Sequence, residues 1–503
     1  MWPPSFGTSL PGGIGCDRAS TSPIATRRFL SSEVTVESDI GLAFWSASSL
    51  ARLIRSRQIS ARELVELHLD RIRRLNPPIN AIVTLHEEGA TARAAEADEA
   101  TAHRESLGPL HGVPITLKDT HSTRALRTTA GYPPLSDYVP LVDGTIAARL
   151  KAAGGILLGK TNTALLAYDQ QTSNPIFGRT NNPWDLTRTP SGSSGGASAA
   201  IAAGLTALDV GSDAGGSIRV PSHFCGVYGL KPTFGLVSQH GHIPDLPGRS
   251  RLDWVLSTSG PIARSLEDVG LALRLISGPD GKDGTIPPAP ASEKKVVEPQ
   301  HLKIAWTRTF PGAPISTEIA SSMERLAKDL AGRGLRVEEA IPNLSFDEQW
   351  RAYQTISNAT WRLRARLHGI DEVNDGEEPP SLKELFEAMD RRDRLIAEWE
   401  EFFTEWSVLL CPPCMTTAYP HSERGSPILV DGKPVRYDDE CRHCYEFNLT
   451  GHPALVCPLS ISAQGLPIGV QMVAARWSDF RLLGIAASLA ETIGAFDPPP
   501  GFV

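Results

Sequence analysis

Two Gly/Ser-rich loops, residues 191–196 and 211–219, constrain the fold of this chain more than any other feature of its sequence. The stretch between them has room for one helix and one strand. Residues 197–205 have the small apolar side chains of a closely packed helix, and residues 206–210 are typical of a short buried strand. A helix followed by a strand brings both loops to the same edge of a sheet.

Each loop carries a serine suited to acyl transfer, Ser193 in the first and Ser217 in the second, 24 positions apart. A serine hydroxyl is a weak nucleophile until a base takes its proton, so acyl transfer by a serine requires a basic side chain nearby. The small residues 214–216 leave backbone N–H groups unshielded ahead of Ser217, which suits an oxyanion hole. Either loop by itself is equally typical of a tight packing turn, because glycine and serine are common in turns.

Helix-like and strand-like patterns alternate along most of the chain, which predicts an α/β layered fold. Ser60 and Glu63 form a capping box ahead of a helix that we expect to end at Pro77 and Pro78. Further helices are expected at residues 92–102, 145–153, 319–330 and 482–493. Strand-like runs at 113–117 and 156–158 should begin a sheet, residues 302–306 restart a strand, and the sheet is completed by 407–410, 454–459 and 468–473.

Three regions differ in composition from the rest of the chain. Residues 1–35 are rich in Pro, Gly, Ser and Arg, which favours a disordered tail or a mis-called start over an organelle-targeting segment. Residues 279–300 form a Pro- and charge-rich linker. Residues 310–405 are expected to be mainly helical and lid-like, and a lid over a pocket is a natural place for substrate selection.

The overall composition is that of an ordinary soluble globular protein, with 41% hydrophobic and 21% charged residues among 503. A net charge of -8 and the lack of a basic stripe give no reason to expect nucleic acid as a partner. The longest apolar runs fall well short of the roughly 20 residues that cross a membrane, so no membrane partner is expected. Seven cysteines, an odd number without a secretory signal, favour a reducing compartment such as the cytoplasm.

Two short motifs match well-known expressions in the wrong context. Residues 154–161 match the phosphate-binding P-loop, but a helix is expected before them and strand-like residues fill the loop position. Residues 192–196 match the nucleophile elbow with Ser194 as the attacking residue, but a polar loop with two prolines precedes them instead of a strand. We therefore interpret the first as a helix-to-strand turn and disfavour the second.

Two CxxC pairs with nearby histidines superficially resemble a zinc site, namely Cys411 and Cys414, Cys441 and Cys444, with His421 and His443. The separation of the pairs is longer than usual. The segment between them favours a β-hairpin with Asp431 and Gly432 at its turn. No metal site is expected here.

The two serine loops and six further segments together resemble the amidase signature family, from about residue 46 to residue 495. The segments are 108–119 (GPLHGVPITLKD), 159–162 (GKTN), 173–178 (SNPIFG), 191–196 (SGSSGG), 213–219 (DAGGSIR), 229–232 (GLKP), 451–454 (GHPA) and 465–471 (GLPIGVQ). Because these pieces occur in order along the chain, the resemblance is highly specific.

The resemblance implies a single α/β/α layered domain over residues 36–503, with a mixed central β-sheet covered by many helices. It makes Ser217 the nucleophile, Lys118 the base and Ser193 the bridging serine, which in the family follows a cis peptide, here Gly192–Ser193. The oxyanion hole falls on the backbone N–H groups of Ala214, Gly215, Gly216 and Ser217. Supporting residues are Ser194, Asp213 and Arg219, and the acyl site is lined by Ala167, Tyr168, Asp169 and Gln170. Ser191 replaces the family's usual glycine, which should require only a local adjustment.

Lys118 can act as a base only if it is neutral, although an unperturbed lysine has a pKa near about 10.4. Burial lowers a lysine pKa by up to about 3–5 units, and the strand-like residues before Lys118 lead it into an apolar layer. A carboxylate close by would oppose this. Asp119 should therefore point away, and Asp213 should be occupied by Arg219 or by backbone donors.

The expected activity is hydrolysis of linear carboxylic amides through an acyl-enzyme, without a cofactor; esters and carbamates are further substrates of the family. The expected binding partner is a small-molecule amide substrate, and the sequence is compatible with a homodimer. One alternative function is the glutaminase subunit of a tRNA amidotransferase, but residues 239–248 differ from the sequence that is usual in that subfamily. The other alternative is a non-catalytic binding protein, which is disfavoured because all three residues of the triad are present. Aromatic residues suggest an apolar or aryl substrate but are equally compatible with a core: Tyr168, Trp350, Trp361, Phe386 and Trp399.

Overall fold

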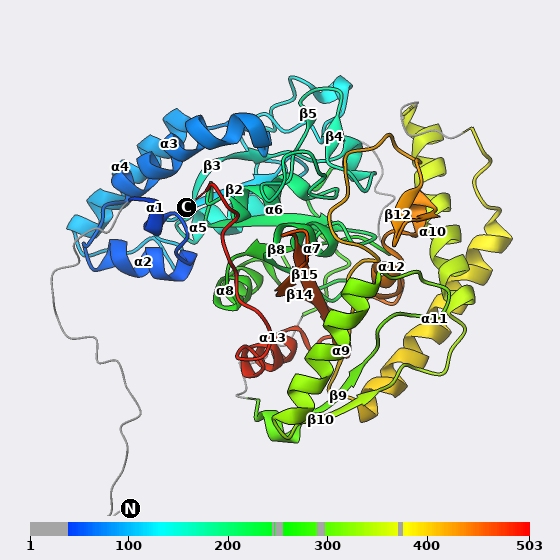
Figure 1. The fold of residues 1–503 in the computed structure, drawn as a ribbon. Helices are drawn as coiled ribbons and strands as arrows, with labels where there is room; N and C mark the ends of the chain where they lie inside the picture. Colours follow the sequence, from blue (N-terminus) through cyan, green and yellow to red (C-terminus); the bar gives the residue numbers. More distant parts are fainter. Residues whose placement is uncertain (1–38, 244–245, 247–254, 289–296, 371–375, 503) are drawn as a thin grey trace, which may run out of the picture. The chain divides into compact units, whose positions relative to one another are not determined.

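An eight-stranded mixed sheet forms the centre of the fold in the computed structural model, which describes residues 39–243, 246, 255–288, 297–370 and 376–502 (Figure 1). The expected tail lies outside the described residues, as does part of the expected linker. The strand order is β10-β9-β11-β15-β14-β7-β8-β6. The strands are β6 Leu208–Asp213, β7 Tyr228–Lys231, β8 Thr258–Ala263, β9 Lys303–Trp306, β10 Arg336–Glu339, β11 Val408–Cys411, β14 Ala454–Ile461 and β15 Pro467–Val473. Strands β10, β9 and β11 run parallel and the other neighbours antiparallel, so the predicted mixed sheet is confirmed.

The strands near residue 113 form a separate three-stranded sheet, which corrects the expectation that they begin the main one. Its order is β1 (Ile82–Leu85), β3 (Ile156–Thr161) and β2 (Pro114–Lys118). Strand β2 adjoins β6 of the main sheet without a regular ladder. The Ala207 N–H donates to Pro114 O at 3.2 Å, and the Thr116 hydroxyl donates to Asp209 at 2.6 Å. This side-by-side placement brings the end of β2 close to the end of β6.

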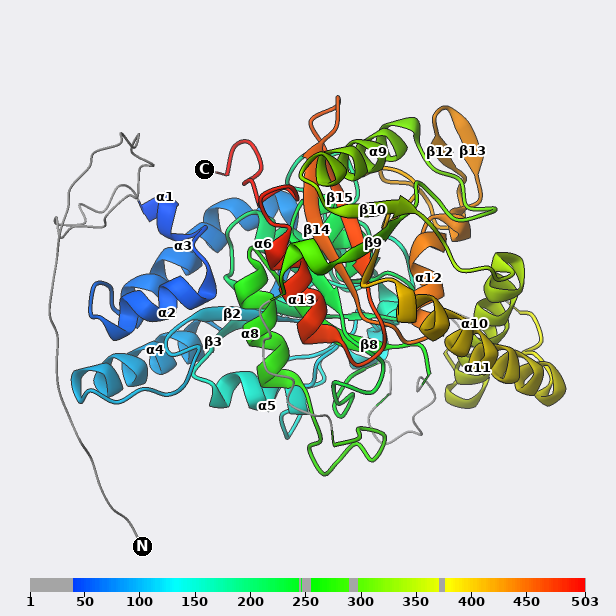
Figure 2. The same ribbon diagram turned by 90° about the horizontal axis from the view of Figure 1, so that it is seen from below.

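Alternating residues of the main sheet bury its two faces against different helices. Residues such as Leu410 and Met472 belong to a core shared with α8 (Leu266–Ile276), α9 (Thr317–Gly332) and α13 (Asp479–Ser488). Their neighbours Leu409 and Val473 pack in a second cluster with Trp399 of α11 (Leu382–Glu405) and Phe447 of α12 (Arg442–Leu449). Successive strand residues point to opposite faces, so this pattern produces the predicted α/β/α layering. Figure 2 shows α10 (Phe346–His368) and α11 beside α12.

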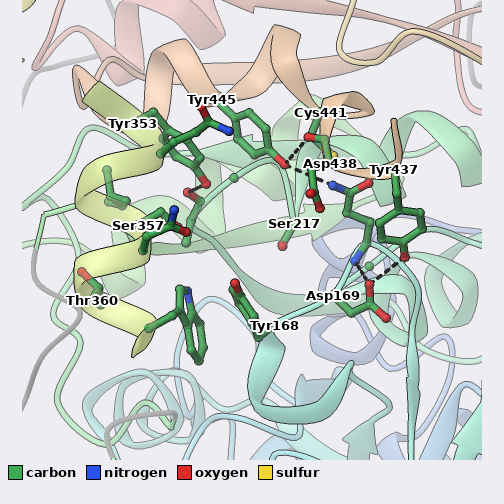
Figure 3. A pocket seen from close by; sticks show the side chains of 18 of the residues that line it. Tyr168, Asp169, Ser217, Tyr353, Ser357, Thr360, Tyr437, Asp438, Cys441 and Tyr445 are labelled. Atoms are coloured by element: carbon green, nitrogen blue, oxygen red, sulfur yellow. Dashed lines mark hydrogen bonds between the residues drawn. The ribbon is translucent and has the colours of Figure 1, made fainter. Parts of the chain in front are cut away.

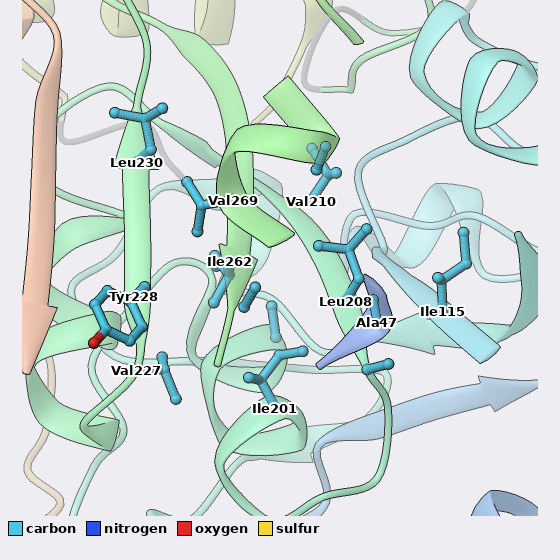
Figure 4. Packing of buried hydrophobic residues seen from close by; sticks show 14 of the residues in the cluster. Ala47, Ile115, Ile201, Leu208, Val210, Val227, Tyr228, Leu230, Ile262 and Val269 are labelled. Carbon is cyan, nitrogen blue, oxygen red and sulfur yellow. The ribbon is translucent and has the colours of Figure 1, made fainter. Parts of the chain in front are cut away.

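The helix between the two serine loops, α6 (Gly195–Ala202), is buried along its whole length. Ile201 packs with Leu208 and Val210 of β6 in the largest core cluster (Figure 4). Strand β6 is longer than predicted, because Gly211, Ser212 and Asp213 continue its pairing with β8. The second loop is therefore shorter than its composition suggested.

Local signals in the sequence agree with the structure at most other elements. The Ser60 capping box starts α3 (Ala61–Ile79), but this helix passes through Pro77 and Pro78 and ends at Asn80, which is left-handed (φ 55°). The predicted hairpin is present as β12 (Ile428–Val430) and β13 (Lys433–Val435), with both turn residues at positive φ. The remaining predicted helices correspond to α4 (Glu87–Ala102), α5 (Thr145–Ala152), α9, α10, α11 and α13.

Within the described parts of the chain, no helix is long and apolar enough to cross a membrane.

Gly196→Ala should destabilise the protein, because a methyl group there would lie 2.5 Å from the backbone N and O of Asn162. Overpacking of a close backbone contact typically costs about 1–3 kcal/mol. Gly332→Ala at the end of α9 is the matched control, since a methyl group there meets nothing within 4 Å. Chemical denaturation should show a lower midpoint for Gly196→Ala only, and equal midpoints would contradict the close packing of α6.

Candidate active site

The two serine loops lie side by side, as their spacing predicts. Ser193 and Ser194 lie at the start of α6, and Ser217 precedes α7 (Arg219–Cys225). The Ser194 N–H donates to the backbone oxygen of Ser217 at 3.1 Å, which joins the loops directly. The peptide between Gly192 and Ser193 is cis, as the resemblance implies.

Lys118, the last residue of β2, is fully buried and its ammonium nitrogen contacts three serines. Lys118 Nζ donates to the hydroxyl oxygens of Ser193 at 2.7 Å, Ser194 at 2.9 Å and Ser212 at 3.0 Å. Sequence reasoning did not foresee Ser212, because its position near Lys118 depends on β6 extending beyond residue 210. The amine is thus held by uncharged hydroxyl groups and not by a carboxylate.

Burial lowers the pKa of Lys118 to about 7, although the charges of Asp213 and Asp209 act in the opposite direction. Asp119 is turned elsewhere: its carboxylate accepts from the hydroxyl of Thr129 at 2.6 Å and from its N–H at 3.1 Å. The expectation that Asp119 points away from Lys118 is confirmed. The surroundings of Lys118 therefore favour its neutral form far more than water does.

Asp213 forms a buried ion pair with Arg219, and both side chains are 0% exposed. Its two carboxylate oxygens accept from Arg219 Nε at 3.0 Å and Nη2 at 2.9 Å, and from Asn448. Burial alone would raise the pKa of Asp213, but Arg219 and these donors hold it well below its usual range. Asp213 was expected to be occupied by Arg219 or by backbone donors, and it accepts from both, the backbone donors being the N–H groups of Gly216 and Ile218.

Asp209 is a buried carboxyl group that sequence reasoning missed. It accepts from the hydroxyls of Thr116 at 2.6 Å and Thr161 at 3.0 Å. Burial raises its pKa to about 7, so it is partly neutral and opposes the neutral form of Lys118 less than an ionised group would. The available signal was an acidic residue inside the apolar run of β6.

The loop after β6 differs in one respect from the expected oxyanion hole. The Gly216 N–H donates to Asp213 at 2.8 Å, so it is directed into the protein and is not available to a substrate. Ala214, Gly215 and Ser217 instead line a cavity of about 770 Å³. Of the four residues expected to form the oxyanion hole, Gly216 therefore has its N–H group occupied by Asp213, and the other three line the cavity.

The cavity brings the expected acyl-site residues together around Ser217 (Figure 3). It is lined by Ala167, Tyr168, Asp169 and Gln170, as the resemblance implies. Asp169 accepts from the Tyr437 hydroxyl at 2.6 Å, and the Gln170 amide donates to the Tyr445 hydroxyl at 3.1 Å. In the view of Figure 3, Tyr353 and Tyr445 lie above Ser217 and Tyr168 lies below it.

The aromatic residues of the middle third divide between cavity, core and surface. Trp350 and Trp361 line the cavity, and the Trp361 ring lies 4.0 Å from that of Tyr168. Trp399 is fully buried in the core, and Phe386 is 71% exposed. Of these four aromatic residues, only Trp350 and Trp361 are therefore placed where they could contact a substrate in the cavity.

Two residues beside the cavity adopt the left-handed backbone conformation, which is uncommon for residues other than glycine. Ala167 has φ 59°, and Ser191, where the family usually has glycine, has φ 64°. The Ser191 hydroxyl donates to the backbone oxygen of Gln170 at 3.3 Å. The serine thus keeps the conformation that glycine adopts freely, which is the expected local adjustment.

The two misleading motifs are resolved by their surroundings. Residues 156–161 of the P-loop match are strand β3, and Lys160 is buried and donates to the His121 backbone oxygen and to Thr123. Ser194 of the elbow match follows a loop and directs its hydroxyl to the Ser212 backbone oxygen at 3.2 Å.

The four cysteines of the CxxC pairs are buried free thiols. Cys414 donates to the backbone oxygen of Glu440, and Cys444 donates to that of Pro413 at 3.0 Å. In the part of the chain that the structure describes, no three His, Cys, Asp or Glu side chains are grouped so as to hold a metal ion.

The fold and the Lys118–serine cluster together define an amidase signature hydrolase. The family model described as Amidase matches residues 63–389 and 380–483, so the chain belongs to this family.

Individual relatives match the chain over nearly its whole length. It is 33% identical to a glutamyl-tRNA(Gln) amidotransferase subunit of Alkaliphilus metalliredigens, over 88% of this chain and 95% of that protein. It is also 33% identical to an acylamidase of Rhodococcus erythropolis, over 89% of this chain and 95% of that protein. Among solved structures, 6-aminohexanoate cyclic dimer hydrolase with bound substrate superimposes with a TM-score of 0.78 and 27% identity, covering 92% of this chain and 99% of that one.

Arg219→Met should strongly destabilise the protein, because it leaves the Asp213 carboxylate buried without its ion partner. Breaking a buried pair in this way typically costs about 3–5 kcal/mol. Arg336→Met is the control, since Arg336 pairs with Glu338 at the surface and each side chain is about half exposed. Urea denaturation should show a large decrease in the free energy of unfolding for Arg219→Met and a decrease below about 1 kcal/mol for the control. Similar losses in both variants would contradict the account of the pair.

Proposed function

We propose that this protein hydrolyses carboxylic amides through an acyl-enzyme formed on Ser217. The observation that carries the proposal is the 2.7 Å contact between Lys118 and Ser193, whose preceding residue Gly192 lines the same cavity as Ser217. A base, a bridging hydroxyl and a serine facing a cavity are the components of nucleophilic acyl transfer.

In the proposed cycle, neutral Lys118 accepts the Ser193 proton while Ser193 accepts the proton of Ser217. The Ser217 oxygen then attacks the carbonyl carbon of the substrate. The developing oxyanion is held by the N–H groups of Ala214, Gly215 and Ser217, which are fixed before the reaction begins. The proton returns through Ser193 to the leaving amine, and water releases the acyl group by the same route.

The lining of the cavity supports an apolar or aryl group on the substrate. Tyr168 and Trp361 form one aromatic wall, and Tyr353 and Tyr445 stack at 4.2 Å to form another. Apolar faces of this kind bury aromatic and aliphatic groups and leave amide recognition to the backbone of residues 167–170. Linear amides are the first substrates to test, followed by esters and carbamates.

A second candidate function is the glutaminase subunit of a tRNA amidotransferase, which the similarity to the Alkaliphilus metalliredigens protein favours. The two functions differ in their dependence on a second subunit. The purified chain by itself should release amine from aryl or aliphatic amides. Ammonia release from glutamine that requires a second subunit, with no activity on other amides, would support the amidotransferase role instead.

Ser217→Ala should abolish amide hydrolysis and labelling by a fluorophosphonate, because both require the Ser217 oxygen as nucleophile. Ser194→Ala is the control: it removes a neighbouring hydroxyl that also contacts Lys118, and its effect should be far smaller. Mass spectrometry of the labelled peptide identifies the modified residue. Loss of labelling in Ser194→Ala together with retention of labelling in Ser217→Ala would contradict the proposal and identify Ser194 as the nucleophile, as in a nucleophile elbow.

The rate of hydrolysis should fall as the pH drops below about 7, because the active form of Lys118 is neutral and its pKa is about 7. The neutral form is present above this pKa and is lost below it. With single protonation the rate at pH 5 is expected to be roughly a hundredfold below the plateau. Steady-state rates across this range, with circular dichroism to verify folding, test the proposal. A rate unchanged between pH 9 and pH 5 would exclude Lys118 as the base.

A further inference from the structure

Tyr353 of helix α10 contacts the loop ahead of Ser217. The Tyr353 hydroxyl donates to the backbone oxygen of Ala214 at 3.1 Å. The Tyr353 side chain is 9% exposed, and its ring stacks on that of Tyr445 with an interplanar angle of 18°. Figure 3 shows both rings on the same side of Ser217. The tyrosine is therefore held rigidly over the loop.

The Ala214 oxygen belongs to the same peptide unit as the Gly215 N–H. In a planar trans peptide the C=O and N–H bonds point in opposite directions, so a donor that fixes the oxygen also fixes the direction of the N–H. Ala214 and Gly215 both line the cavity beside Ser217. A hydrogen bond to the carbonyl also polarises the N–H of the same peptide and strengthens its donation.

Gly215 is adapted to this close approach. A Cβ atom at this position would lie 2.6 Å from the Tyr353 hydroxyl oxygen and 2.6 Å from a ring carbon of Tyr445. Any side chain at residue 215 would therefore push the two tyrosines away from the loop. Burial raises the pKa of Tyr353 well above its usual value, so its hydroxyl keeps the proton that it donates.

We propose that Tyr353 is a positioning residue that holds the 214–215 peptide with the Gly215 N–H directed at the oxyanion of the transition state. The inference rests on the proposed function of Ser217. It assigns to the helical middle region a part in catalysis beyond covering the cavity. The simpler role for Tyr353, a wall of the substrate site, would affect binding of the ground state and not the chemical step.

Tyr353→Phe is the decisive variant, because it removes the hydroxyl and retains the ring that stacks on Tyr445. Tyr228→Phe is the matched control: Tyr228 is 8% exposed, and its hydroxyl donates to the backbone oxygen of Gly494 at 3.3 Å, outside the cavity lining. Both changes delete one buried hydroxyl that donates to a backbone carbonyl. They differ in whether that carbonyl belongs to the loop ahead of Ser217.

The readout is the concentration dependence of fluorophosphonate labelling at Ser217, which separates the limiting rate from the apparent affinity without requiring the natural substrate. We expect Tyr353→Phe to lower the limiting rate about tenfold or more and to change the apparent affinity less than about twofold. With an amide substrate, kcat should fall in the same way while KM is retained. Tyr228→Phe should leave both quantities near those of the unmodified protein.

Two results would overturn the positioning role. One is an unchanged limiting rate in Tyr353→Phe, and the other is a loss confined to the apparent affinity or KM. Labelling of Ser217→Ala by the same probe separates this failure from failure of the proposed function. If Ser217→Ala is still labelled, the proposed nucleophile is wrong; if it is not labelled and Tyr353→Phe reacts normally, only the role of Tyr353 is wrong.

Discussion

The burial of the Lys118 amine among serine hydroxyls is the interaction on which the rest of the site depends. Lowering its pKa from the usual 10.5 to about 7 changes the free-energy difference between its charged and neutral forms by an amount on the order of 5 kcal/mol, in favour of the neutral form. Any ionised carboxylate in contact with the amine would remove this effect. The surrounding structure therefore binds each acidic neighbour elsewhere: Asp213 to Arg219, Asp119 to Thr129, and Asp209 to Thr116 and Thr161.

The fold meets this requirement by placing two sheets edge to edge. Strand β2 ends at Lys118, and β6 ends at Asp213 beside it, so the lysine enters a layer that is closed by α6. The small residues of α6 permit its close approach, and the two residues immediately before the helix, Ser193 and Ser194, contact the amine. The same arrangement leaves Ser217 at the cavity. Its loop is held by two hydrogen bonds, from the Gly216 N–H to Asp213 of the buried ion pair and from the Tyr353 hydroxyl to the Ala214 oxygen.

Much of this could be predicted from the sequence where the signal is local. The capping box at Ser60 and the hairpin turn at Asp431 each depend on a few adjacent residues, and the two serine loops are separated by only one helix and one strand. The features that were missed depend on contacts between distant segments. Ser212 reaches Lys118 only because β6 extends along β8, and Tyr353 meets Ala214 across 139 positions of chain. No local pattern marks either contact.

The directions of individual N–H groups also could not be predicted from the sequence. The small residues 214–216 indicated unshielded backbone N–H groups, but not that the N–H group of Gly216 would donate to Asp213. The passage of α3 through Pro77 and Pro78 has a similar cause, because its end is set by left-handed Asn80 and not by the prolines. In both cases composition identified the segment, while a specific backbone conformation decided its detail.

The central claim is that Lys118 is a neutral base, and a direct titration of this lysine tests it. Lysine labelled with ¹³C at Cε reports its protonation by NMR, and the Lys118→Met variant assigns the signal by its disappearance. The account predicts one lysine signal, absent from that variant, that titrates with a pKa of about 7. A Lys118 signal that titrates at about 10 or above, like a solvated lysine, would contradict it.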